Sequence, residues 1–229
     1  MKNSQDRLAA LREQMKKKQI DAFIVPSYDP HQSEYVADHW QARRWLTGFD
    51  GSAGVAVVTQ QEAHLWTDSR YFIQAEEQLK GSGFELMRLK VPHTPEYVGW
   101  LKTNLPEGAT VGIDGQLYAV GQVRRLKKQL AQKGLSVRYD EDLVGEVWSS
   151  RPPLPADSVF ELAMEYAGQS RRDKMTAVRA EMDSRFLLVT ALDEIAWLLN
   201  IRGKDVPCNP VAISYLLLGM EEAVWFIDP

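Results

Sequence analysis

The stretch "GVAVVTQQEAHLWTDSRYFIQA", residues 54–75, decides the fold class of this chain. It contains two apolar runs, 54–59 and 62–67, separated by the polar pair Gln60 and Gln61. Two such runs with a short polar connection predict an antiparallel β-hairpin. A helical pattern of aromatic and polar residues follows at 69–79. A hairpin that leads into a helix predicts an α/β fold whose sheet is mixed rather than purely parallel.

Strand and helix patterns alternate on both sides of this hairpin. The opening residues predict an amphipathic helix, because Leu8, Leu11 and Met15 recur at helical spacing. Further helices are predicted in the segments 93–105, 119–134 and 141–150, and short apolar runs predict further strands at 21–26, 84–89, 106–114 and 135–140. The sequence therefore predicts a mixed β-sheet flanked by helices in a first domain that spans residues 1–150.

A proline-rich segment, 151–157, separates this domain from a second one. Pro152, Pro153 and Pro155 stiffen the chain and resist both helix and sheet, which is typical of a linker. From residue 158 to residue 229 the alternation of helix and strand starts again. We interpret 158–229 as the start of a second domain.

The two halves of the chain resemble each other in the order of their elements. Trp45-Leu46 in the first half matches Trp197-Leu198 in the second, and Glu62-Ala63 matches Glu222-Ala223. A weak internal duplication of one α/β unit explains this order, and chance similarity of two α/β segments is the alternative. The first copy continues far beyond Thr67-Asp68, which ends its hairpin, whereas the second has only one residue after the matching Ile227-Asp228. We therefore expect the second copy to be incomplete.

Composition and charge exclude several classes of partner. The formal net charge is −4, so a nucleic-acid partner is not expected. The sequence has no apolar run of membrane-spanning length, and its polar N-terminus does not resemble a signal peptide. Its single cysteine, Cys208, cannot form an internal disulfide. We expect a cytoplasmic protein with no membrane partner.

No catalytic constellation is visible in the sequence. The four histidines, at 31, 39, 64 and 93, show no metal-ligand spacing, so we predict no metal site in this chain. The glycine-rich "FDGSAG", residues 49–54, lies between a helix and a strand. A phosphate-binding loop needs the reverse order, strand before helix, so a tight turn is the better interpretation.

Asp68 and Arg70 stand where a buried strand ends and a helix begins. One interpretation is a helix cap with a solvated arginine beside it. The other is a pair of groups that is presented to a ligand. The residues alone leave both interpretations open.

Five stretches together carry a resemblance to a known family: "HQSEY" at 31–35, "GFDGSAG" at 48–54, "WTDSRYFIQA" at 66–75, "VTALDEIAWLLNIRG" at 189–203 and "NPVAISY" at 209–215. They resemble the Xaa-Pro aminopeptidase (aminopeptidase P) family, and more narrowly its long, three-domain cytosolic form. The resemblance covers essentially the whole chain. It implies two creatinase-type N-terminal domains, in agreement with the duplication.

The resemblance also implies a parent enzyme that removes the N-terminal residue from peptides with proline in second place. In that family a third domain, of the pita-bread metallopeptidase type, binds two divalent metal ions, for which manganese is expected. No position of this sequence matches those metal ligands. We therefore expect the 229-residue chain alone to be inactive and to hold no cofactor.

By the same resemblance, the N-terminal domain leans over the catalytic cleft of the parent enzyme. Arg70 would then reach the far end of the peptide, because its fork of donors suits carboxylate or carbonyl oxygens. Asp68 would orient Arg70, with Tyr71 and His31 as companions. These four residues are the predicted substrate-binding set.

Two other functions remain open. A free-standing, non-catalytic creatinase-like binding or scaffold module is the main alternative. A creatinase-like amidinohydrolase is disfavoured, since that group resembles a single N-terminal domain joined to a catalytic one. Both for an aminopeptidase portion and for a binding or scaffold module, we expect a homodimer or larger assembly through residues 186–229. The reason is that the strand "AVWFI" at 223–227 is apolar on both faces.

Overall fold

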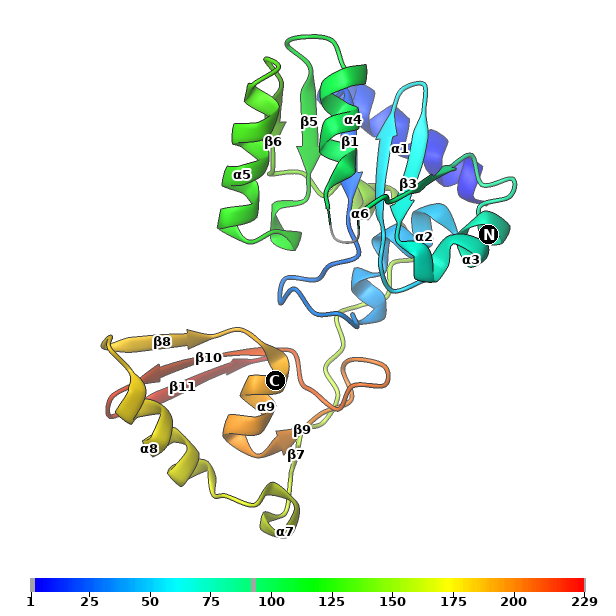
Figure 1. Cartoon of the computed structure of the whole chain (residues 1–229). Coiled ribbons are helices and arrows are strands. Elements are labelled where there is room, and N and C mark those ends of the chain that lie inside the picture. The colour runs from blue at the N-terminus through cyan, green and yellow to red at the C-terminus, as the bar shows by residue number, and fades with distance from the viewer. Residues whose placement is uncertain (1–2, 92–93, 229) are drawn as a thin grey trace. The chain divides into compact units, whose positions relative to one another are not determined.

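The computed structural model describes residues 3–91 and 94–228, which form two compact units (Figure 1). The first unit consists of Met1–Pro30 and Trp40–Arg151, and the second of His31–His39 and Pro152–Pro229. The segment 31–39 thus joins the second unit, although it lies within the range that the sequence assigns to the first domain. Two hydrogen bonds hold it there: His31 Nδ1–H donates to Thr190 O (2.8 Å), and His39 Nδ1–H donates to Pro152 O (2.7 Å).

A six-stranded mixed sheet forms the centre of the first unit, in the order β4-β3-β2-β1-β5-β6. Only the pairs β1–β2 and β2–β3 are antiparallel, and the other neighbours run parallel. The predicted hairpin and mixed sheet are therefore confirmed. The strands are β1 (Ala22–Val25), β2 (Val55–Thr59), β3 (Ala63–Thr67), β4 (Glu85–Arg88), β5 (Thr110–Ile113) and β6 (Ser136–Arg138).

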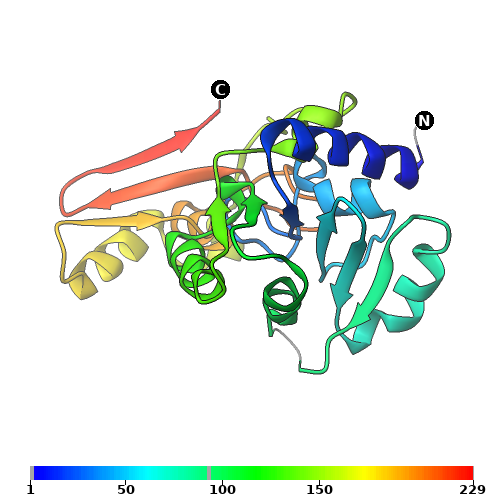
Figure 2. The same cartoon turned by 90° about the horizontal axis from the view of Figure 1, so that it is seen from above.

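Helices pack on both faces of this sheet. On one face α1, α2 and α6 bury a cluster that includes Leu11 and Phe23, and on the other α4 and α5 bury Ile24 and Trp66. Figure 2 shows α1, in dark blue, across the sheet from the green helices α4 and α5. The helices are α1 (Ser4–Lys18), α2 (Ala42–Thr47), α3 (Phe72–Gln78), α4 (Glu96–Asn104), α5 (Val120–Ala131) and α6 (Leu143–Val147), with short 3₁₀ helices η2 (Ser69–Tyr71) and η3 (Gly115–Leu117). A further 3₁₀ helix, η1 (Asp38–Trp40), begins within the segment 31–39.

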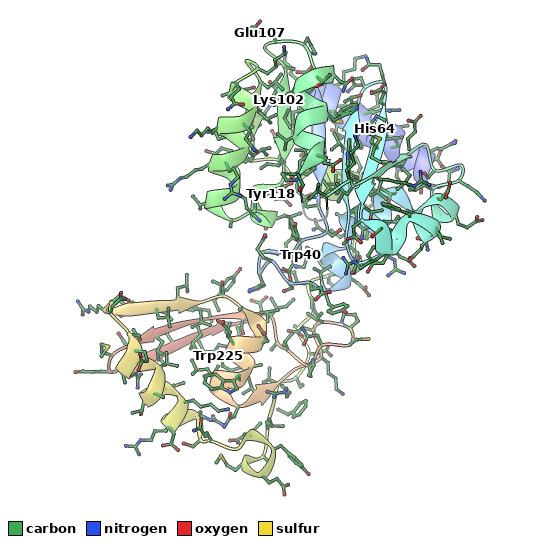
Figure 3. All side chains as sticks on the ribbon, in the orientation of Figure 1. Trp40, His64, Lys102, Glu107, Tyr118 and Trp225 are labelled. Carbon is green, nitrogen blue, oxygen red and sulfur yellow. The ribbon has the colours of Figure 1, made fainter. Side chains whose placement is uncertain are left out.

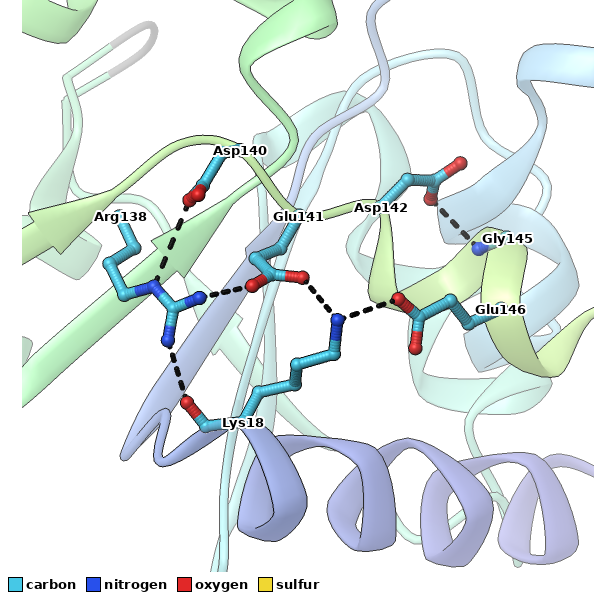
Figure 4. A network of polar contacts seen from close by, with 7 residues as sticks. All are labelled: Lys18, Arg138, Asp140, Glu141, Asp142, Gly145 and Glu146. Atoms are coloured by element: carbon cyan, nitrogen blue, oxygen red, sulfur yellow. Dashed lines mark hydrogen bonds and ion pairs between the residues drawn. The ribbon is translucent and has the colours of Figure 1, made fainter.

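An ion-pair network ties the end of α1 to the segment that follows β6 (Figure 4). Lys18 Nζ lies 2.9 Å from Glu141 Oε2 and 3.2 Å from Glu146 Oε1, and these hydrogen bonds raise the pKa of Lys18. Arg138 contacts Glu141 and donates to the carbonyl oxygen of Lys18 (2.7 Å). Because Glu141 is buried, its two cationic partners compensate its desolvation.

The second unit is built on a three-stranded antiparallel sheet in the order β11-β10-β8. Two helices, α8 and α9, cover one face of it, where Trp225 joins the apolar cluster (Figure 3). A separate pair of short strands, β7 and β9, lies beside them. The elements are β7 (Phe160–Glu161), α7 (Met164–Ala167), α8 (Arg171–Glu181), β8 (Phe186–Val189), α9 (Leu192–Leu199), β9 (Ile201–Arg202), β10 (Ser214–Gly219) and β11 (Ala223–Ile227).

The three strands β8, β10 and β11 repeat the register of β1, β2 and β3. Leu217 pairs with Leu188 and Val224, just as Val57 pairs with Ile24 and His64. The hairpin turns also close in the same way, with Thr59 N–H donating to Glu62 O and Gly219 N–H donating to Glu222 O, both at 2.9 Å. The two units therefore share one three-stranded motif at residue-level register.

One face of this motif has different surroundings in the two units. In the first unit Ile24 and Trp66 are 0% and 3% exposed beneath α4 and α5. Their register equivalents in the second unit, Leu188 and Phe226, are 59% and 51% exposed. We call this surface of the second unit the open face; its exposed side chains are Phe186, Leu188, Val224 and Phe226.

The loop 49–54, which carries "FDGSAG", packs at the edge of the first sheet where β1, β3 and β5 end. Its carbonyl groups are held by side chains from three elements. Ser27 Oγ, after β1, donates to Gly54 O (2.7 Å), and Thr67 Oγ1, in β3, donates to Ala53 O (2.6 Å). The segment is therefore a fixed turn, as its place between a helix and a strand predicts.

Arg43, on α2, is the main anchor of this loop. Its guanidinium donates to Phe49 O and Ser27 Oγ, each at 2.7 Å, and to Gly51 O. All three acceptors are neutral oxygens, and the side chain is only 3% exposed. Burial lowers the pKa of Arg43 to about 10, while the charge of Asp50 opposes that shift. A buried cation without a direct anionic acceptor is held by the geometry of these carbonyl groups.

Asp114 is a buried carboxylate at the same edge, directly after β5. Its Oδ1 accepts a hydrogen bond from Gln116 N (3.0 Å), and the residue is 7% exposed. Desolvation raises the pKa of Asp114 to about 6, with a smaller contribution from Asp142, while the charge of Arg151 lowers it. The folded protein therefore binds a proton at Asp114 more tightly than the unfolded chain does.

Replacing Arg43 with methionine should destabilise the first unit. Arg43→Met leaves the carbonyl oxygens of Phe49 and Gly51 without their donor, and two such buried groups correspond to about 2–4 kcal/mol of unfolding free energy. Arg44→Met is the matched control, because Arg44 is the next residue on α2 and its side chain is 52% exposed. Urea unfolding should show a change within about 0.5 kcal/mol for the control. Equal losses in both variants would contradict the anchoring role.

Asp114→Asn should stabilise the chain at neutral pH. The folded pKa of about 6 lies above the ordinary value of 3.8, so the unfolding free energy of the wild type falls as pH rises from about 4 to about 6. The difference corresponds to at most about 3 kcal/mol. Urea unfolding at about pH 7.5 and about pH 4 measures both effects. At the higher pH Asp114→Asn should have a larger unfolding free energy than the wild type, and its unfolding free energy should not show this fall between the two pH values. Asp140→Asn is the control, because the carboxylate of Asp140 is exposed. If Asp114→Asn is less stable than the wild type at the higher pH, the desolvation argument is wrong.

Candidate functional site

Asp68 and Arg70 form a two-point ion pair at the end of β3. Arg70 Nε donates to Asp68 Oδ1 and Arg70 Nη2 donates to Asp68 Oδ2, both at 2.8 Å. Asp68 Oδ1 also accepts from Arg70 N (3.1 Å), so that Asp68 caps the 3₁₀ helix η2. The carboxylate therefore fixes both the start of the helix and the plane of the guanidinium.

The two partners differ in their access to solvent. The side chain of Asp68 is 8% exposed, whereas that of Arg70 is 57% exposed. The pair thus has a buried anchor and an accessible cation. The planar fork of donors on a guanidinium suits carboxylate and carbonyl oxygens, and Asp68 holds this fork in one plane.

Tyr71 lies against Arg70 and connects it to the loop 49–54. The Arg70 guanidinium carbon lies 5.2 Å from the centre of the Tyr71 ring. Tyr71 Oη and Ser52 Oγ are 2.8 Å apart and share a hydrogen bond. The structure therefore brings Asp68, Arg70 and Tyr71 together, three of the four residues predicted to bind substrate.

His31 belongs to the second unit. Its ring centre lies 4.5 Å from that of Tyr215, and its Nδ1–H donates to Thr190 O at 2.8 Å. The residue is 9% exposed. A place for His31 beside Arg70 stays a prediction.

The loop also contacts the helix that follows Arg70. Asp50 Oδ1 accepts from Gln74 Nε2 (2.6 Å) and Gln78 Nε2 (2.7 Å) on α3. The hydrogen bond from Gln78 makes the largest contribution to a lowered pKa of Asp50, so this carboxylate is ionised at neutral pH. The loop 49–54 and the segment 68–78 are therefore tied together at two places, by Asp50 and by Ser52.

Two residues that support the site, Arg43 and Ser52, were not singled out from the sequence. A signal for Arg43 exists, because Leu46 and Thr47 follow it at spacings of three and four residues and both are buried. An arginine on the buried stripe of a short helix predicts a role in holding the backbone. Nothing in the sequence pattern singles out Ser52.

The described residues do not form a catalytic metal centre. Within residues 3–91 and 94–228, no cluster of three or more histidine, cysteine, aspartate or glutamate side chains is arranged to hold a metal ion. Cys208 is an exposed thiol. In the same part of the chain, no helix combines the length and apolar character needed to cross a membrane. The charged group that this site presents to solvent is the guanidinium of Arg70.

Comparison with known proteins gives matches along nearly the whole chain. Two family models, both described as the creatinase/prolidase N-terminal domain, match residues 7–140 and 150–229. A probable Xaa-Pro aminopeptidase P of Laccaria bicolor is 45% identical over 99% of this chain, and Xaa-Pro aminopeptidase 2 of Rattus norvegicus is 40% identical over 94%. The matched regions make up 36% and 33% of those two proteins.

A solved structure agrees with these matches. The X-prolyl aminopeptidase of Caenorhabditis elegans, described as a cytosolic enzyme with a di-nuclear active site, superposes with a TM-score of 0.92 at 36% identity. The superposition covers all of this chain and 39% of the nematode protein. The chain thus spans between 33% and 39% of the length of these relatives. It belongs to the creatinase/prolidase N-terminal domain family, and its homologues are Xaa-Pro aminopeptidases.

Proposed function

We propose that this chain is the non-catalytic N-terminal portion of a metal-dependent Xaa-Pro aminopeptidase, and that it contributes Arg70 to the binding of the peptide. The observation that carries this proposal is the Asp68–Arg70 pair, in which a buried carboxylate holds an accessible guanidinium. The identity to Xaa-Pro aminopeptidases over nearly the whole chain supports the reaction class. The substrate is a peptide with proline in second place.

The catalytic chemistry is assigned to the part of the enzyme that this chain does not cover. The relatives are about three times as long, and the nematode relative has a di-nuclear active site. We propose two divalent metal ions there, with manganese as the expected metal. Because this chain matches only about a third of those relatives, we expect that the chain alone does not hydrolyse peptides.

The proposed organisation keeps a first domain at 1–150, a linker at 151–157 and the beginning of a second domain at 158–229. The two family-model matches, 7–140 and 150–229, support it. The segment 31–39 departs from this division, because it belongs to the first domain in sequence but packs with the second unit. A cytoplasmic location is proposed by analogy with the cytosolic nematode relative.

A binding or scaffold module is the second candidate, and the open face favours it. Four large apolar side chains on one side of a three-stranded sheet are a surface that associates with another apolar surface. β11 is also an edge strand of that sheet, and its outer edge can pair with another strand. We propose that the second unit forms a homodimer through this face.

Arg70→Ala should weaken peptide cleavage in a complete enzyme. A suitable enzyme is a chimaera in which this chain replaces the matching 36% of the Laccaria bicolor relative. Loss of one charge-assisted hydrogen bond to the peptide should lower kcat/KM about ten- to hundredfold, because such a bond contributes roughly 1.5–3 kcal/mol. Bound metal, measured by elemental analysis, should not change.

Arg88→Ala is the matched control for Arg70→Ala. Arg88 is also an exposed arginine; it stacks over Phe72 at 5.6 Å and pairs with Glu76 at 3.1 Å. Its removal should leave kcat/KM within about twofold of the parent chimaera. If Arg70→Ala is folded, binds its metal and cleaves peptides as fast as the parent, the peptide-binding role of Arg70 is wrong.

The open face should cause self-association of the 229-residue chain. Leu188→Lys and Phe226→Lys place charges on this face and should shift the mass toward a single chain of 26.0 kDa. Phe160→Lys, at an exposed residue on β7 rather than on the open face, is the control. Light scattering after size exclusion, over a series of dilutions, measures the masses. A wild-type mass that stays at one chain at every concentration would exclude the dimer.

A further inference from the structure

Four side chains of the first unit contact one another, each with the next, in a line that runs from the core to the surface. The Arg43 guanidinium lies 4.9 Å above the Phe49 ring, Phe49 meets Tyr71 edge to face with ring centres 5.9 Å apart, and Arg70 lies 5.2 Å above Tyr71. We call these four residues the arginine–aromatic column. Its inner end, Arg43, is buried, and its outer end, Arg70, is the accessible cation of the candidate site.

The loop 49–54 locks this column from the side. Ser52 shares a hydrogen bond of 2.8 Å with the Tyr71 hydroxyl. At Gly51 the backbone passes so close to both rings that an added Cβ would lie 2.3 Å from Phe49 Cζ and 2.7 Å from Tyr71 Cδ1. Real contacts of that length do not occur, so only glycine fits here without displacing a ring. Tyr71 is thus fixed at its hydroxyl by Ser52 and along its ring edge by the loop backbone.

We propose that Ser52 and Arg43 are positioning residues that set the orientation of Arg70. Arg43 holds the carbonyls of Phe49 and Gly51, this fixes the path of the loop, and Ser52 on that loop holds Tyr71 under Arg70. Asp68 fixes the plane of the guanidinium from one side, and Tyr71 supports it from another. The kinetic meaning of this device rests on the proposed role of Arg70 in peptide binding.

The physical consequence is pre-organisation of a flexible side chain. An arginine has four rotatable side-chain bonds, and a ligand that must immobilise it binds more weakly than one that meets it already ordered. A Tyr71 ring that loses its hydroxyl partner gains freedom and gives Arg70 a less defined support. The expected effect is a weaker affinity for the peptide, expressed in KM, with a smaller change in kcat.

The first test measures the order of the Arg70 side chain in the 229-residue chain itself. Heteronuclear relaxation of the Arg70 Nε–Hε group reports its motion on the ps–ns timescale. Ser52→Ala and Tyr71→Phe each remove the same hydrogen bond, and both should lower the heteronuclear NOE of Arg70. Ser69→Ala, which removes an exposed hydroxyl next to Arg70 in sequence, is the matched control and should leave it unchanged. An unchanged NOE in both Ser52→Ala and Tyr71→Phe overturns the positioning role, whatever the kinetics show.

The second test is a double-mutant cycle in the Laccaria chimaera. Ser52→Ala should raise KM about two- to tenfold in the parent background, which is the range for one neutral hydrogen bond. In the Arg70→Ala background the same substitution should have no further effect on KM, because Ser52 acts through Arg70. A merely structural serine would raise KM equally in both backgrounds, and that result would overturn the inference.

The two tests separate this inference from the proposed function. If Arg70→Ala alone leaves the kinetics unchanged, the peptide-binding role of Arg70 fails, while a lowered Arg70 NOE in Ser52→Ala still supports the positioning device. If Arg70→Ala impairs cleavage and Ser52→Ala changes neither the NOE nor KM, the proposed function stands and the positioning role fails.

Discussion

The buried guanidinium of Arg43 is the constraint on which the candidate site depends. A cation that is 3% exposed needs acceptors for its N–H groups, and here they are two backbone carbonyls of the loop 49–54 and the hydroxyl of Ser27. This requirement fixes the path of the loop, and the path in turn demands a residue without a side chain at Gly51. The loop then holds Tyr71, and Tyr71 supports Arg70. One desolvated charge in the core thus determines the orientation of an accessible charge at the edge of the sheet.

The same three-stranded motif occurs twice, and its surroundings explain the different character of the two units. In the first unit α1 and α2 cover one face and α4 and α5 the other, so both faces of β1, β2 and β3 are apolar and buried. In the second unit α8 and α9 cover one face of the sheet. The open face is apolar as well, as is typical of strands that are covered on both sides. The apolar residues of β11 on the open face therefore indicate a surface that favours contact with another apolar surface.

Much of this architecture is predictable from the sequence, because it depends on local pattern. The hairpin 54–67, the alternation of strand and helix and the internal repeat follow from apolar periodicity and turn residues, and the cap on Asp68 follows from its place before a helix. The packing of 31–39 with the second unit is not visible in the sequence, since it depends on hydrogen bonds between residues far apart, such as His31 with Thr190. Ser52 was missed for the same reason, because the position of its partner, the Tyr71 hydroxyl, is defined only by the folded chain. For Arg43 the spacing along α2 indicates burial, but the carbonyl groups that it holds are identified only in the folded chain.

The most direct test of the central claim is a crystal structure of the Laccaria chimaera with a bound, non-hydrolysable peptide that has proline in second place. The claim is that the Asp68-held guanidinium of Arg70 binds the peptide. It predicts an Arg70 nitrogen about 2.7–2.9 Å from a carboxylate or carbonyl oxygen of the peptide, with the bonds to Asp68 retained. A peptide that occupies the cleft while Arg70 contacts only groups of the protein would contradict the claim.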